Sequence, residues 1–315
     1  DLDAAINSYK KALKIRSDYA EVYNNMGVAL QSNGNIEAAI NSYNKALHIK
    51  PNYTEAYNNM GIAQKDNGDL EAAIHSYKQA LKLKPDYAHA YNNMGIALKD
   101  TGDLEAAIHS YKQALNIKPN YAEAYSNMGN ALKDRGDLES AIHSFKQAIK
   151  FNPGYAEAFN NIGNALKDKG DLEAAIKNYK RATQIKPNYA HAYYNMGIAL
   201  QGNDNVEAAI ENYEQAVTIK PDYAEAYYNL GTALISMGNR EAAIENYRQA
   251  AQIKPDYAKA RAQKLHQQAQ ICDWEAIEED LALIPELGIL TQAVSPFSML
   301  SFEDSPERHK MRSEA

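Results

Sequence analysis

The feature that most constrains this chain is a short phrase that returns every 34 residues. Lysine, proline, aspartate or asparagine, and tyrosine follow one another in six places, and Asn152–Tyr155 keeps a variant of the phrase in a seventh. The six lysines are Lys50, Lys84, Lys118, Lys186, Lys220 and Lys254. A frame set at Ala20 gives seven full repeats over residues 20–257. Such a period predicts stacked copies of one supersecondary unit.

Each repeat is predicted to contain two helices. In the third repeat the first helix runs from Ala88 to about Lys99, Gly102 marks a turn, and Asp103 caps a second helix that ends before Pro119. At 100° per residue, repeat positions 4, 7, 8 and 11 share one face of the first helix, and positions 2, 6, 9 and 13 lie on the face turned away from it. Small residues at positions 8, 20 and 27 allow a close approach of helices.

An aromatic residue at position 4, Gly at 8, Ala at 20, an aromatic residue at 24, Ala at 27 and Pro at 32 together resemble the tetratricopeptide repeat (TPR). The resemblance implies an all-α fold, a right-handed TPR superhelix or α-solenoid of helix-turn-helix repeats, with first helices on the concave side. Residues 1–19 match the second helix of a truncated repeat, and residues 258–285 continue the frame as a degenerate eighth repeat. Residues 286–315 no longer repeat.

The segments Cys272–Trp274 and Val294–Leu300 resemble the junction between repeats and catalytic region in protein O-GlcNAc transferases and their bacterial relatives. Some members carry a histidine-rich stretch where this chain has Ser295–Phe297, so no role of those histidines is carried over. The resemblance implies that residues 286–315 begin a glycosyltransferase-like region that continues beyond Ala315. The chain itself is expected to hold no catalytic, cofactor or metal site, because about 30 non-repeat residues cannot build a nucleotide-sugar site.

Position 6 of the first helix is asparagine in all seven repeats, although position 5 beside it varies. An asparagine amide both donates to and accepts from a peptide group without reading side chains. Stacked helix pairs advance roughly 10 Å per repeat, which is about three residues of extended chain at ~3.3 Å each. We therefore predict a peptide-binding row on the concave face, formed by Asn25, Asn59, Asn93, Asn127, Asn161, Asn195 and Asn229.

The resemblance to O-GlcNAc transferases extends the same role to these residues, since an asparagine ladder at this position holds substrate polypeptide there. The alternative is that the amides bond helix ends or neighbouring repeats and touch no ligand. Two aromatic residues near the row, Tyr194 and Tyr228, replace polar ones and are further ligand-binding candidates. Lysines at position 12 each precede an aspartate, so their charge is expected to be balanced locally; they are Lys65, Lys99, Lys133 and Lys167.

Composition narrows the classes of partner. A net charge of -7 gives no electrostatic reason to expect nucleic acid or an anionic membrane. The single cysteine excludes an internal disulfide, and no apolar run approaches the ~20 residues that span a bilayer, so a cytoplasmic location fits best. The recurring His75, His109 and His143 would lie about 10 Å apart, which is too far for metal ligands that need contacts near 2 Å.

Two functions remain open at this stage. The first is the substrate-recognition arm of an O-GlcNAc transferase-like protein. The second is a stand-alone or chaperone-linked TPR adaptor that grips a C-terminal carboxylate; that mode favours Lys at position 5 and Asn at position 9, and only Asn130 and Asn164 meet either condition. Self-association is also expected through the truncated N-terminal helix, whose apolar stripe comprises Leu2, Ala5, Ile6, Tyr9 and Leu13.

Overall fold

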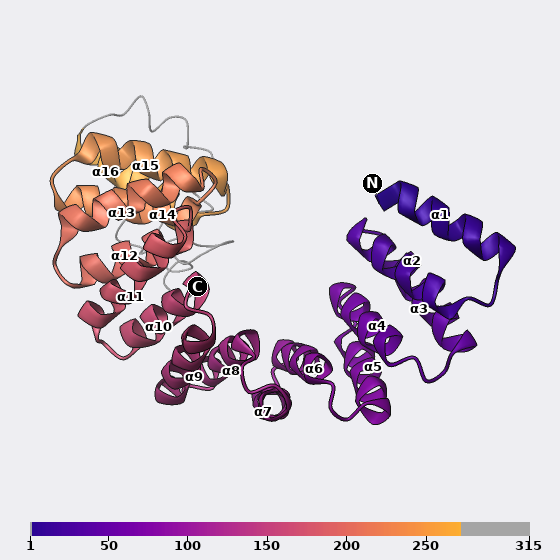
Figure 1. The fold of residues 1–315 in the computed structure, drawn as a ribbon. Helices are drawn as coiled ribbons and strands as arrows, with labels where there is room; N and C mark the ends of the chain where they lie inside the picture. Colours follow the sequence, from indigo (N-terminus) through magenta and orange to yellow (C-terminus); the bar gives the residue numbers. More distant parts are fainter. Residues whose placement is uncertain (1, 272–315) are drawn as a thin grey trace, which may run out of the picture. The chain divides into compact units, whose positions relative to one another are not determined.

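The computed structural model describes residues 2–271, which form sixteen α-helices. The predictions for Cys272, for the second helix of the eighth repeat and for residues 286–315 lie outside this part. The helices are α1 (Leu2–Ile15), α2 (Ala20–Ser32), α3 (Ile36–Ile49), α4 (Thr54–Asp66), α5 (Leu70–Leu83), α6 (Ala88–Asp100), α7 (Leu104–Ile117), α8 (Ala122–Asp134), α9 (Leu138–Phe151), α10 (Ala156–Asp168), α11 (Leu172–Ile185), α12 (Ala190–Gly202), α13 (Val206–Ile219), α14 (Ala224–Ser236), α15 (Arg240–Ile253) and α16 (Ala258–Gln270), labelled in Figure 1.

The fold is an all-α helical-repeat superhelix, as the repeat pattern predicts. Each even-numbered helix from α2 to α14 is the first helix of a repeat, and the odd-numbered helix after it is the second. The described helices divide into two compact units, residues up to Asn161 and residues from Ile162. Within the first unit α4 contacts both α2 and α6, and within the second α12 contacts α14. In these pairs the first helices of successive repeats therefore lie against one another.

Each second helix begins at a side-chain cap. In the third repeat Asp103 Oδ1 accepts a hydrogen bond from the Ala106 backbone N–H at 3.1 Å, and an asparagine or aspartate does the same at this position in every complete repeat. The residue before the cap is glycine in six repeats, with Gly102 at φ +87°. In the sixth repeat Asp204 takes this left-handed conformation instead, at φ 58°.

The core of a repeat is built on one close approach between its two helices. The ring of Tyr111, on α7, is fully buried and lies against the backbone of α6 at Gly95. A Cβ atom at Gly95 would meet ring atoms at less than 3.0 Å. The same relationship recurs in all seven repeats, with Phe145 in place of tyrosine in the fourth. Glycine is therefore required at position 8 by an aromatic ring, which explains why the sequence keeps it.

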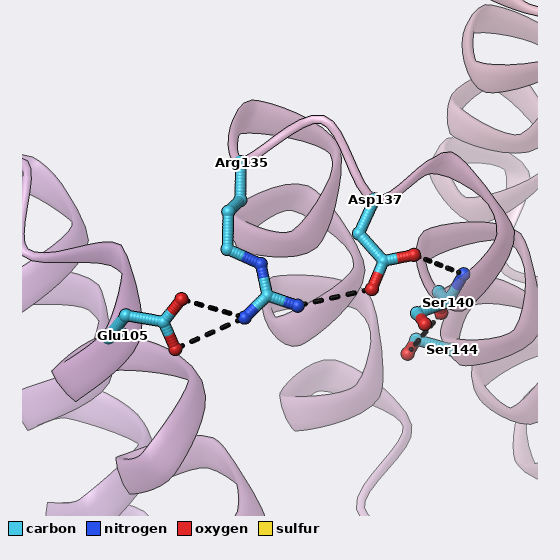
Figure 2. A network of polar contacts seen from close by, with 5 residues as sticks. All are labelled: Glu105, Arg135, Asp137, Ser140 and Ser144. Carbon is cyan, nitrogen blue, oxygen red and sulfur yellow. Dashed lines mark hydrogen bonds and ion pairs between the residues drawn. The ribbon is translucent and has the colours of Figure 1, made fainter.

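Polar side chains join neighbouring repeats at the turns, as Figure 2 shows for Arg135. Its guanidinium Nη1 contacts both carboxylate oxygens of Glu105, on α7, at 2.9 and 3.1 Å, and its Nη2 contacts Asp137 at 3.1 Å. Asp137 also caps α9 by accepting from the Ser140 N–H. Hydrogen bonds from Ser140, then the charge of Arg135, hold the pKa of Asp137 below its usual value.

The N-terminal helix α1 packs on α2. Of the predicted apolar stripe, Ile6 is buried at 6% exposure, and Leu2 is 41% exposed. Two more apolar side chains are exposed at the end of the helix and just beyond it, Ile15 at 90% and Tyr19 at 39%. The uncovered apolar surface of α1 is thus smaller than the sequence indicates and lies mainly at the two ends of the helix.

Candidate polypeptide-binding surface

The seven position-6 asparagines lie on the first helices, α2 to α14, and are here called the asparagine row. Asn25 is exposed and the other six are half-buried. Each stands beside a position-5 residue that is more deeply buried in the first five repeats; Asn58, for example, is 5% exposed and Asn92 is 1% exposed. The row therefore forms the accessible edge of a polar layer whose inner edge is position 5.

The row is hydrogen-bonded from repeat to repeat. Asn59 Nδ2 donates to Asn24 Oδ1 of the preceding repeat at 3.1 Å. Asn93 Nδ2 donates in the same way to Asn58 Oδ1 at 3.1 Å. The next link runs from Asn127 Nδ2 to an asparagine oxygen on α6 at 3.0 Å. The amide hydrogen bonds to neighbouring repeats that were the alternative interpretation of the row are therefore present.

Where position 5 is not asparagine, another group supplies the acceptor. Serine stands at position 5 of the fourth repeat, and Asn161 Nδ2 donates instead to Asn130 Oδ1, one helical turn further along α8, at 3.0 Å. In the second unit Asn229 Nδ2 donates to the hydroxyl oxygen of Tyr194, which occupies position 5 of the sixth repeat, at 3.2 Å. The link is kept while the acceptor changes.

These contacts leave hydrogen-bonding capacity on the exposed edge. Asn93 uses one of its two N–H groups for Asn58, and an amide oxygen can accept two hydrogen bonds. The second N–H of Asn93 and its Oδ1 are thus available in the geometry of a peptide group. In three repeats the buried position-5 asparagine also donates to the position-6 oxygen, which leaves that oxygen one lone pair. These bonds run from Asn24 to Asn25 at 3.3 Å, from Asn58 to Asn59 at 3.5 Å and from Asn160 to Asn161 at 3.4 Å.

Sequence reasoning identified position 6 but missed its partner at position 5. The available signal was a substitution pattern: Asn130, at position 9, is present where position 5 has become serine, and Asn130 supplies the acceptor there. The lysines at position 12 are paired with aspartate, as predicted. Lys65 contacts Asp66 at 3.1 Å, and Lys99 contacts Asp134 of the next repeat at 3.3 Å.

Between residues 2 and 271 no group of three histidine, cysteine, aspartate or glutamate side chains could hold a metal ion. Burial, and then Lys220, lowers the pKa of His191, and burial raises the pKa of Tyr121 to about 12. In the same part of the chain no helix combines the length and apolar character needed to cross a bilayer.

Comparison with known families decides what kind of chain this is. The model described as TPR repeat matches residues 1–34, 32–68, 64–102, 97–134, 129–170, 163–204 and 203–238, and the tetratricopeptide repeat model matches residues 224–257. The chain belongs to the tetratricopeptide repeat family. Its TPR array is a protein–protein interaction scaffold, and a search of curated proteins finds no match to it.

Solved structures are similar to the TPR chain over different lengths. MamA is 28% identical, with 53% of this chain and 97% of that chain covered and a TM-score of 0.48. YrrB, described as a TPR protein with an unusual peptide-binding site, is 24% identical, with 59% and 96% covered and a TM-score of 0.48. The Cut9–Hcn1 hetero-tetramer of the APC/C has a chain that is 16% identical, with 84% and 52% covered and a TM-score of 0.61. The last likeness shows a shared fold.

Proposed function

We propose that this TPR chain binds polypeptides in an extended conformation through the asparagine row. The observation that carries the proposal is the amide of Asn93, which is held by Asn58 yet keeps an N–H and an oxygen for a ligand. Repeats advance roughly 10 Å, so a ligand would meet one such amide about every three residues. Because the amides bond to the ligand backbone, binding is tolerant of ligand sequence.

At finer detail, we propose that the chain is the substrate-recognition arm of an O-GlcNAc transferase-like protein. The support is the resemblance of Cys272–Trp274 and Val294–Leu300 to the junction that precedes the catalytic region in that family. Reading the gene past Ala315 tests this directly. A coding sequence that continues into a glycosyltransferase is expected, and a coding sequence that ends without one would favour the stand-alone adaptor.

The binding proposal is tested with matched variants of two residues that share one hydrogen bond. Asn93→Ala removes the exposed amide and also leaves the buried Asn58 oxygen without its partner. Asn58→Ser removes the same inter-repeat bond but keeps the Asn93 amide, and serine already occupies position 5 at Ser126. Leaving the buried Asn58 oxygen unpaired costs about 1–3 kcal/mol, so Asn93→Ala should melt earlier than the parent chain. Asn58→Ser should lose less stability, because it removes that acceptor together with the bond.

The readout is fluorescence anisotropy of labelled, unstructured 15-residue peptides, measured well below the melting temperature. If the row binds polypeptide, Asn93→Ala, and more strongly its combination with Asn127→Ala, weakens binding while Asn58→Ser does not. A peptide with methylated backbone nitrogens should also bind more weakly, because it lacks the N–H that the asparagine oxygen accepts. Equal affinity for all variants and for the methylated peptide means that the row is purely structural.

A further inference from the structure

Position 5 changes its chemistry in the sixth and seventh repeats. It is asparagine or serine in the first five repeats and tyrosine at Tyr194 and Tyr228. Tyr194 lies on α12, and its hydroxyl oxygen accepts the hydrogen bond from Asn229 of the asparagine row at 3.2 Å. Tyr228 lies on α14, directly before Asn229 in the chain. Both tyrosines therefore lie immediately beside the surface assigned above to polypeptide binding.

Each of these rings packs against two other tyrosine rings and stays partly exposed. The ring of Tyr194 packs on that of Tyr223, with centroids 4.8 Å apart and planes tilted by 45°. The ring of Tyr228 packs in the same way on Tyr257, at 5.3 Å and 42°. Both position-5 tyrosines remain half-buried, whereas the asparagine at position 5 of the third repeat is 1% exposed. Aromatic surface thus replaces buried amide in the second unit.

We propose that Tyr194 and Tyr228 select ring-bearing side chains, aromatic or proline, at two positions three residues apart in a bound extended polypeptide. The inference rests on the function proposed above and assigns a preference to that same surface. The spacing follows from the repeat: the two tyrosines occupy equivalent positions in successive repeats, roughly 10 Å apart, and an extended chain rises ~3.3 Å per residue. The preference follows from the favourable packing of rings on rings.

The surroundings favour a neutral ring over a cation as the ligand group. A positive side chain is also attracted to the face of a tyrosine. Lys220 Nζ already lies 4.7 Å from the ring centroid of Tyr223, and Lys254 Nζ lies 5.4 Å from that of Tyr257. These are the rings that support Tyr194 and Tyr228, so the cation site on each supporting ring is already taken by a lysine of this chain, and Lys254 also pairs with Glu225 at 3.7 Å.

The test uses 12-residue peptides with a serine, alanine and glycine host sequence. One peptide carries two phenylalanines three residues apart, a second carries them two residues apart, and a third carries two lysines three residues apart. We expect the first peptide to bind on the order of 10-fold tighter than the host, since each ring pair adds a favourable contact. The other two should bind about as well as the host.

Two variants assign the preference to the tyrosines. The Tyr194→Asn, Tyr228→Asn double variant restores the residue found at position 5 of the first three repeats and should bind the first peptide no better than the host. The Tyr194→Phe, Tyr228→Phe double variant keeps the rings and should keep the preference, which separates ring chemistry from loss of folding. The inference would be overturned, and the proposed function left standing, if the parent chain bound the host and the first peptide equally. The same would follow if it bound the lysine peptide best. Failure of the parent chain to bind any peptide would overturn the proposed function.

Discussion

A Cβ atom on Gly95 would lie 2.6 Å from Cε1 of Tyr111. Real Cβ contacts are not this short, so the pair can exist only while position 8 carries no side chain. Tyr111 is fully buried, and neighbouring atoms leave its ring no room to withdraw without disturbing the repeat. The helix pair is thus held at a separation that glycine alone permits.

Replacing Gly95 with alanine is therefore expected to destabilise the first unit. Alanine favours a helix by about 1 kcal/mol relative to glycine, but overpacking a well-filled core costs about 1–3 kcal/mol or more. The net loss should be up to about 2 kcal/mol, measured by urea unfolding followed by circular dichroism. In a Tyr111→Leu background the same substitution should cost less. An equal cost in both backgrounds would show that the ring is not the obstacle.

Buried tyrosine hydroxyls divide into two groups with opposite expected effects. Tyr179 donates to Asn164 Oδ1 at 2.8 Å, and Tyr77 has no hydrogen-bond partner for its buried hydroxyl. The positions that supply an acceptor elsewhere are occupied in the second repeat by Ile62 and Lys65, which cannot accept. Phenylalanine already occupies the equivalent position at Phe145.

Tyr179→Phe should cost about 1 kcal/mol, because a hydrogen bond is lost and its acceptor is left short of a partner. Tyr77→Phe should be neutral or stabilise by up to about 1 kcal/mol, because it removes an unpaired buried donor. Thermal melts of the two variants, which delete the same oxygen atom, provide the comparison. Equal losses in both would mean that the Tyr77 hydroxyl finds a partner in solution.

Acid should weaken the Arg135 network shown in Figure 2 through Asp137. The folded pKa of this carboxyl lies below its usual value, so its contribution to stability is present above the unfolded pKa of about 4 and is lost as pH falls through the folded pKa. Asp137→Asn keeps an N-cap of the kind found at Asn35 and loses the charge. The parent chain should be more stable than the variant at pH 7, and the difference should shrink as the pH falls below about 4. A difference in unfolding midpoint that stays constant with pH would contradict this account.

Residues 1–315 are expected to self-associate through α1. Leu2 and Ile15 expose 41% and 90% of their surfaces, and each apolar side chain that becomes fully buried gains ~1.5 to 3 kcal/mol. Light scattering over a concentration series should show association that Leu2→Glu with Ile15→Glu abolishes. Ile6 is left unchanged because it packs within the chain. A parent chain that stays monomeric would refute the expectation.

The period of the sequence was sufficient to predict the fold. The second helix expected at Leu104–Ile117 has those bounds in the structure, because its cap and its proline stop are both visible as residue types. The asparagine row was equally visible at position 6. Its inter-repeat partner was not, because position 5 lies 100° away from position 6 on the helix and belongs to neither of the two faces that the spacing defined.

Burial and hydrogen bonding at position 5 depend on the neighbouring repeat, which helical periodicity within one repeat does not describe. Asparagine, serine and tyrosine at this position look like neutral drift in the sequence. The structure shows that the drift is compensated, by Asn130 where serine stands and by the hydroxyl of Tyr194 where tyrosine stands. Only contacts between residues about one period apart reveal this.

The link from Asn93 to Asn58 also bears on how such an array can grow. A repeat with asparagine at both positions brings the donor that the previous copy needs and the acceptor that the next copy needs. Duplication or deletion of one whole repeat of this kind therefore keeps each hydrogen bond between successive repeats and leaves no position-6 donor without its position-5 acceptor. A tandem gene segment that encodes such a repeat can change its copy number in one genetic event. The protein that results is expected to fold with the same hydrogen bonds between its repeats.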